Sequence, residues 1–254
     1  MKKILTFFAS VVLCTAVQAQ SVNLHLKNGS TVYYSDKDVE YVDFNESMAA
    51  PSGTRAVDLG LPSKVKWATH NIGAVNPWDK GQFFAWGETK GSEWPESHNF
   101  WWDNYKWCSG TNTTLTKYCS SQYYGKVDNK TALENADDAA KQNWGGNWRM
   151  PTVAECNELI DNTDNYYSFF NSIPGRWFVH KQKNDSIFIP AIGVRYHEEQ
   201  GEVGRFGAYW SSEKPGDSQE NAFGLFFAGE NFADWKFYRA ELRCYGLPIR
   251  PVQK

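Results

Sequence analysis

Residues 137–152 read DDAAKQNWGGNWRMPT, and this stretch decides how the chain folds. The two leading acids lie where the first turn of a helix favours negative charge. The four residues Ala139 to Gln142 are good helix formers. Gly145 and Gly146 follow directly and predict the end of this helix, because glycine adopts the left-handed conformation of a helix C-cap at little cost.

A second helix is predicted to begin at the end of the stretch. Pro151 disfavours helical geometry at the residue before it, so the segment between the two helices should be extended. Thr152 and Glu155 have the spacing of a capping box. The apolar face of this helix would consist of Val153, Cys156, Leu159 and Ile160. We expect Trp144 and Trp148 to pack together and hold the two helices in place.

The rest of the chain divides into segments of different composition. Residues 1–19 have the basic start, the apolar run and the small-residue cleavage site of a secretory signal peptide, and the run is too short to span a membrane. Residues 20–45 alternate apolar and polar side chains around the hairpin turn signal Asn28-Gly29, which predicts a small β appendage. Residues 46–55 are a polar linker, and residues 56–254 form one domain.

Charge and composition limit the classes of function that the protein can have. The net charge is −3, and removal of the signal peptide with its two lysines leaves −5, which argues against a nucleic-acid partner. We expect an exported protein that is periplasmic, cell-surface or extracellular and has no membrane span. Short runs of strand with helices gathered in the middle predict an α+β fold whose strands are mostly antiparallel. The terminal strands, near Val57 and near Ile249, are expected to meet.

Five further motifs accompany residues 137–152. They are Val57–Pro62, Val65–Thr69, Phe83–Thr89, Tyr209–Ser212 and Gly246–Val252. Together they resemble the Fibrobacter succinogenes major paralogous domain of secreted and surface proteins of anaerobic bacteria, over about residues 56–254. The resemblance implies a C-type-lectin-like or formylglycine-generating-enzyme-like fold with long aromatic-rich loops, and it carries no established activity. Two cysteines that the family often has are absent, one at His70 and one near residues 162–165.

Four cysteines remain after cleavage of the signal peptide, and export permits disulfides. The favoured bond joins Cys108 to Cys119 and would make a long loop rigid. A bond between Cys156 and Cys244 is also open, although Cys156 could equally be a small apolar residue of the helix face.

Tryptophans in loop sequence are the strongest candidates for ligand contact. Trp94, Trp101 and Trp102 are accompanied by Asp103 and Asn104, so rings that can stack on a sugar lie beside groups that can bind its hydroxyls. The alternative is that these indoles pack beneath the loops as core filler. Five other tryptophans lie within motifs or strands and are expected in the core: Trp67, Trp86, Trp144, Trp148 and Trp210.

A group of oxygen-bearing side chains could hold calcium, which takes six to eight oxygen ligands. Its members are Asp128, Asn129, Asp137 and Asp138. The alternative is structural, with a turn at Asp128-Asn129 and a helix start at Asp137-Asp138. The tripeptides of calcium-dependent lectins, Glu-Pro-Asn and Gln-Pro-Asp, do not occur in the sequence. Calcium is the only cofactor that the sequence suggests.

The histidines are scattered, and no nucleophile elbow, phosphate loop or zincin motif is present. We therefore expect a non-catalytic binding module for a glycan or an extracellular host or matrix protein. The alternative is a structural or interaction component that docks through the N-terminal β appendage. A remote alternative is an enzyme of the formylglycine-generating type, which would require an exposed reactive thiol.

Overall fold

The computed structural model describes residues 21–25, 31–35, 50–92, 99–229 and 240–254. The chain divides into two compact units, residues 1–47 and 48–254. In the first unit, β1 (Ser21–His25) and β2 (Thr31–Ser35) pair antiparallel. The predicted signal peptide lies outside the described residues. None of the helices within the described ranges has the length and apolar character needed to cross a bilayer.

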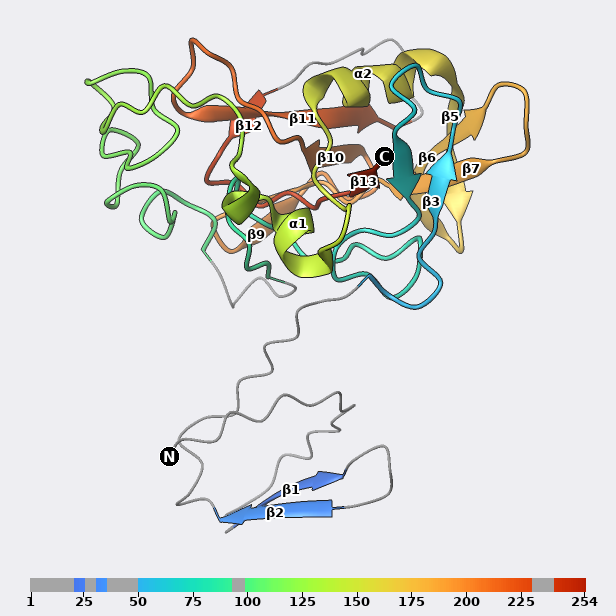
Figure 1. Cartoon of the computed structure of the whole chain (residues 1–254), viewed down its shortest axis with the longest axis horizontal. Helices are drawn as coiled ribbons and strands as arrows, with labels where there is room; N and C mark the ends of the chain where they lie inside the picture. The colour runs from blue at the N-terminus through green and yellow to red at the C-terminus, as the bar shows by residue number, and fades with distance from the viewer. Residues whose placement is uncertain (1–20, 26–30, 36–49, 93–98, 230–239) are drawn as a thin grey trace. The chain divides into compact units, whose positions relative to one another are not determined.

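The second unit is an α+β domain dominated by small antiparallel sheets, as the sequence predicts (Figure 1). Its sheets have the orders β13-β4-β3, β5-β6-β7, β10-β11-β12 and β8-β9. The strands are β3 (Ala56–Asp58), β4 (Lys66–Ala68), β5 (Thr163–Phe170), β6 (Ile173–His180), β7 (Ser186–Pro190), β8 (Val194–Tyr196), β9 (Glu199–Gly201), β10 (Phe206–Trp210), β11 (Asn221–Ala228), β12 (Ala240–Leu242) and β13 (Val252–Gln253). The long green loops of about residues 100–130 lie at the opposite end of this unit from the β5-β6-β7 sheet (Figure 1).

The first predicted helix is α1 (Ala139–Trp144), preceded by the short 3-10 helix η3 (Asn135–Asp137). The Asp138 side chain caps α1 by accepting a hydrogen bond from the Lys141 backbone N–H. Gly145 ends the helix with φ +66°, in the left-handed region that glycine adopts readily. The glycine stop is confirmed, whereas the two acids expected in the first turn precede it, with Asp138 as the N-cap and Asp137 in η3.

The second predicted helix, α2 (Val153–Asn162), begins at the expected capping box. The Thr152 hydroxyl accepts from the Glu155 backbone N–H, and the Glu155 carboxylate accepts from the Thr152 N–H. Trp144 and Trp148 meet edge to face with ring centroids 5.2 Å apart, which confirms the predicted contact. Trp144 is buried, whereas Trp148 is only half-buried and so is less enclosed than predicted.

The two ends of the domain meet in one sheet, as predicted. Val57 of β3 and Val252 of β13 are both register partners of Trp67 in the central strand β4. Trp67 is fully buried there. The first and last strands thus close the domain around one tryptophan.

Two further tryptophans link distant segments of the core. The Trp86 indole N–H donates to the Ser211 carbonyl at 2.9 Å, and the Trp210 indole N–H donates to the Phe84 carbonyl at 2.7 Å. Both side chains are fully buried, as predicted. Buried indoles usually find such an acceptor, and these reciprocal bonds fix residues 83–86 against β10.

Arg243 organises the long loop that precedes the helices. Its buried guanidinium donates to the Tyr105 hydroxyl at 2.8 Å and to the carbonyls of Lys117 at 2.8 Å, Tyr118 at 3.0 Å and Gln219 at 3.2 Å. All four acceptors are neutral. Three of the four belong to residues 99–133, so one side chain satisfies much of the polar backbone of a loop without regular structure.

Replacement of Arg243 by methionine should destabilise the domain by about 3 kcal/mol or more, because each buried acceptor left without a donor costs about 1–3 kcal/mol. Urea unfolding followed by tryptophan fluorescence measures the change. The matched control is Arg205→Met, which removes a guanidinium that is 70% exposed and should shift stability by less than about 0.5 kcal/mol. Equal effects of the two substitutions would contradict the role given to Arg243.

Candidate functional site

Four rings form a continuous strip on the second unit, which we call the aromatic strip: Trp101, Tyr196, His197 and Tyr245. Trp101 stacks on His197 with centroids 4.4 Å apart and on Tyr245 with centroids 5.9 Å apart. Tyr245 in turn lies 6.0 Å from Tyr196. The interplanar angles lie between 27° and 40°, so neighbouring rings are closer to parallel than to edge-on.

Two backbone bridges bring these rings together from three distant parts of the chain. Phe100 and His197 exchange both backbone hydrogen bonds, at 3.1 and 3.2 Å, which sets Trp101 beside His197. Arg195 and Gly246 exchange theirs at 2.9 and 2.8 Å, which sets Tyr245 beside Tyr196. A Cβ atom at Gly246 would lie 2.8 Å from the Phe100 ring, so only glycine allows this approach.

The outer part of the strip faces solvent. Tyr196 is 37% exposed and His197 is also exposed, whereas Trp101 and Tyr245 are half-buried. His197 occupies the turn between β8 and β9 with φ +50°, a left-handed conformation that few non-glycine residues adopt.

Burial raises the pKa of the Tyr245 phenol, and the nearby charges of Cys244, Glu241 and Tyr196 act in the same direction. The Tyr245 hydroxyl therefore stays protonated at neutral pH and can donate a hydrogen bond. Behind the strip, the buried Arg195 guanidinium lies between the rings of Phe83, at 5.4 Å, and Phe100, at 5.3 Å. The contacts of Arg195 with these two rings help to hold β8, the strand that carries Tyr196.

The residues predicted to contact a ligand lie in different environments in the structure. Trp101 belongs to the strip, and Asp103 and Asn104 are exposed beside it in the same loop. The prediction for Trp102 is wrong: it is only 6% exposed and meets the Tyr105 ring edge-on at 5.7 Å, so it fills the core. Trp94 lies outside the described residues.

The four predicted calcium ligands hold other partners. The Asp128 carboxylate accepts the backbone N–H groups of Tyr118, Cys119 and Lys130 at 2.9–3.2 Å, and Asn129 forms the turn beside it with φ +55°. Asp138 is the cap of α1. Within the described ranges, no three His, Cys, Asp or Glu side chains gather as metal ligands. The structural alternative explains these contacts.

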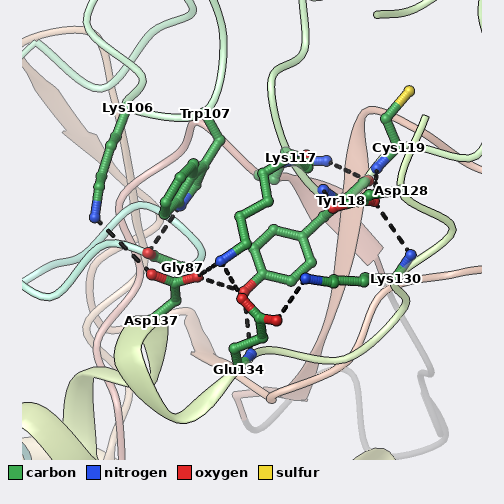
Figure 2. A network of polar contacts seen from close by, with 11 residues as sticks. Gly87, Lys106, Trp107, Lys117, Tyr118, Cys119, Asp128, Lys130, Glu134 and Asp137 are labelled. Carbon is green, nitrogen blue, oxygen red and sulfur yellow. Dashed lines mark hydrogen bonds and ion pairs between the residues drawn. The ribbon is translucent and has the colours of Figure 1, made fainter. Parts of the chain in front are cut away.

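Asp137 belongs to a separate network around Tyr118, shown in Figure 2. Its carboxylate accepts from the Tyr118 hydroxyl and from the Lys117 ammonium, each at 2.5 Å. Asp128 binds the backbone N–H of the same tyrosine, so Tyr118 lies between the two carboxylates (Figure 2). Lys117 also pairs with Glu134. The two acids therefore act as separate anchors of one loop.

The predicted disulfide between Cys108 and Cys119 is not formed, and all four cysteines of the described residues are free thiols. The Cys108 thiol donates to the Trp102 carbonyl at 2.9 Å, and the Cys119 thiol donates to the Ser121 carbonyl at 3.1 Å. Hydrogen bonds and Arg243 hold this loop in place of a covalent bond.

Sequence reasoning missed three members of the strip: Tyr196, His197 and Tyr245. No local motif joins them to Trp101, because one bridge connects residues about a hundred positions apart and the other connects residues about fifty apart. The sequence signals available were the polar run after Tyr196 and the aromatic residue immediately before the motif Gly246–Val252. Neither signal shows by itself that the segments meet.

Substitution Asp128→Asn should lower stability by about 1 kcal/mol, a cost typical of losing a side-chain acceptor for backbone N–H groups. Burial alone would raise the pKa of Asp128, but its N–H donors and the Lys130 ammonium hold it below the ordinary value. A depressed pKa stabilises the fold above the unfolded value of about 3.9, and this contribution disappears as pH falls through the folded pKa. The difference between wild type and variant should therefore vanish in acid.

Thermal unfolding across that pH range, with Asp164→Asn as an exposed control, measures this effect. A difference that does not change with pH would contradict it. Stabilisation by calcium of the wild type but not of Asp128→Asn would restore the metal-ligand interpretation.

Comparison of the chain with family models, with curated proteins and with solved structures gives no match. The geometry of the aromatic strip is therefore the basis on which a function is argued.

Proposed function

We propose that this protein is an exported, non-catalytic binding module that holds a glycan on its aromatic strip. The observation that carries the proposal is the strip itself, with four adjoining rings whose outer members are exposed. Aromatic side chains combine an apolar surface with a polar edge, which suits the apolar face and the surrounding hydroxyls of a pyranose. Few other surfaces of a protein offer both.

Exposed polar residues follow the ring residues closely in the sequence and could bind hydroxyls of a bound sugar. Asp103 and Asn104 are exposed in the loop of Trp101, and Glu198 and Glu199 are exposed after His197. The Tyr245 hydroxyl adds a donor. Binding sites of this type fix orientation with a few polar groups around a larger apolar contact.

The architecture and the leader sequence support the same proposal. The first and last strands of the domain share one sheet, and the loops of residues 99–133 are long and rich in aromatic residues. Both features suit the C-type-lectin-like fold implied by the resemblance to the Fibrobacter succinogenes major paralogous domain. The signal peptide predicted at residues 1–19 would suit a surface protein.

The thiols favour a binding role over catalysis of the formylglycine-generating type. Cys119, Cys156 and Cys244 are buried. Burial raises the pKa of Cys156, of Cys244 and of the half-buried Cys108, which keeps these three thiols protonated at neutral pH.

A second candidate function is docking to another protein through the N-terminal unit. Here β1 and β2 pair over five residues each as a two-stranded sheet. Two-stranded hairpins are marginally stable alone, and a partner strand added at one edge would stabilise this one. Deletion of residues 20–47 would then abolish partner binding while glycan binding by the second unit persisted.

The test of the glycan proposal is a glycan and polysaccharide screen on the mature chain, with calcium and again with chelator. Substitution Tyr196→Ala should weaken binding at least about tenfold, or about 1.4 kcal/mol, because it removes an exposed ring of the strip. Trp101→Ala should do the same through the centre of the strip. Binding should persist in chelator.

The matched control is Tyr166→Ala, which removes a tyrosine that is 54% exposed on β5, outside the strip. It should leave binding unchanged. Equal losses for Tyr166→Ala and Tyr196→Ala, or no binding to any glycan, would overturn the proposal. Near-ultraviolet circular dichroism checks that each variant keeps its tertiary structure.

A further inference from the structure

We propose that His70 is a pH-sensitive switch, whose neutral ring holds residues 50–55 against the domain and whose protonation in acid releases them. The proposal is independent of the function proposed for the aromatic strip. It rests on the burial of the ring, on the two hydroxyl groups bonded to it and on the buried arginine that flanks it. Histidine is the side chain whose ordinary pKa lies in the range where such a switch operates.

The hydrogen bonds of the His70 ring define its neutral form. The residue is only 4% exposed, and its Nδ1 atom lies 3.2 Å from the Thr54 hydroxyl oxygen and 2.9 Å from the Thr69 hydroxyl oxygen. The Val75 backbone also hydrogen-bonds the ring and acts to raise its pKa, as a carbonyl acceptor does. We therefore assign the proton of the neutral ring to Nε2, so that Nδ1 accepts from the two hydroxyls.

Protonation of the ring converts Nδ1 from an acceptor into a donor. The hydroxyl hydrogens of Thr54 and Thr69 then lose their acceptor. The Thr69 oxygen already accepts the Arg55 backbone N–H at 3.0 Å, and Thr69 is only 8% exposed, so its hydroxyl hydrogen has little access to water. A buried donor without an acceptor destabilises the arrangement that contains it.

The charges around the ring also oppose protonation. Among the described residues, the charged groups that act on the ring are Arg250, which precedes β13, and Asp79, in the loop after β4. The buried Arg250 guanidinium donates to the Asn71 side-chain oxygen at 2.8 Å and to the Ala68 carbonyl at 3.1 Å, on either side of His70. Burial and then the Arg250 charge lower the pKa of His70, whereas Asp79 acts to raise it. The Asp79 carboxylate is itself held by two N–H groups of its own loop.

Residues 50–55 are the part of this site that is least firmly held. The Thr54 N–H donates to the Pro51 carbonyl at 2.9 Å, so the segment forms a turn of its own, and three of its six residues are exposed. On the other side of the ring, the Asn71 side chain donates to two carbonyls at the far end of the loop of residues 73–79, at 3.1 and 3.2 Å. Opening of the first segment therefore admits water to a charged ring at the lower cost.

The direction of the pH effect follows from the lowered pKa of the closed form. The neutral ring stabilises the closed form above the open-form value of about 6.5, and this stabilisation is lost as pH falls through the pKa of the closed form. The segment lies within the predicted linker of residues 46–55, so its release would loosen the connection between the two units in acid.

Hydrogen exchange of the mature chain, followed by NMR, tests the switch. The amides of Thr54 and Arg55 are hydrogen-bonded in the closed form. After correction for the intrinsic pH dependence of exchange, their protection should fall about tenfold between about pH 7.5 and about pH 5.5, because the open form gains a proton. The Ile72 amide, which is bonded to the Ile249 carbonyl, should keep its protection. Equal losses at Ile72, or a loss confined to residues 73–79, would overturn the proposal.

A variant with a neutral side chain identifies the titrating group. His70→Asn places an amide oxygen near the position of Nδ1, so the protection of Thr54 and Arg55 should no longer depend on pH. The matched control, His180→Asn, removes a half-buried histidine of β6 and should keep the dependence. An equal dependence in wild type and His70→Asn would contradict the switch.

Titration of the His70 ring in the wild type needs no substitution and therefore does not depend on the folding of a variant. The ring should have a pKa below its ordinary value, and the loss of protection should accompany its protonation. A ring that becomes protonated while Thr54 and Arg55 stay protected would show that the closed form tolerates the charge, and the proposal would be wrong.

Discussion

The buried guanidinium of Arg243 holds together a part of the molecule that has little structure of its own. Residues 99–133 form isolated bridges but contain no helix or strand. Their carbonyl groups must still find donors when they are buried. Arginine can supply up to five N–H groups in a fixed fork, and the faces of Trp86 and Tyr105, 5.4 and 5.2 Å away, accommodate the charge. One side chain thereby supplies hydrogen bonds that a helix or a sheet would otherwise provide.

The same anchor determines where the aromatic strip lies. The Tyr105 hydroxyl accepts from Arg243 and donates to the Trp86 carbonyl, so the loop is fixed to the core at that point. Trp101 lies four residues before Tyr105 in the loop, and Tyr245 lies two residues after Arg243. Their stacking therefore follows from the packing of the residues between them. Within the strip, Tyr196 belongs to the short strand β8, whereas Trp101 and Tyr245 lie in loops that are fixed by these contacts.

The helix pair could be predicted from the sequence because its signals are local: an acidic cap, two glycines and a capping box within a few residues. The β5–β6 hairpin could not. Its turn residues, Asn171 and Ser172, both have positive φ but form no strong turn dipeptide, and Pro174 and Gly175 argue against a strand. The glycine is needed because a Cβ there would lie 2.5 Å from the Ile189 carbonyl oxygen. That contact exists only in the folded protein, so residue propensities along the sequence could not predict the strand.

Neighbouring tryptophans show the same limit at the site, because Trp101 joins the surface strip and Trp102 enters the core. Their sequence environment is shared, but the bridge between Phe100 and His197 brings Trp101 to the strip, whereas Trp102 packs against Tyr105 in the core. Two groups of residues have different roles here. Phe100, Arg195 and Gly246 are buried and support the strip. Tyr196, His197 and Glu198 are exposed. Substitution in the exposed group would alter what the surface binds and leave the supporting contacts intact. A fold with its contact residues on loops above a rigid core can therefore change its ligand while keeping its stability.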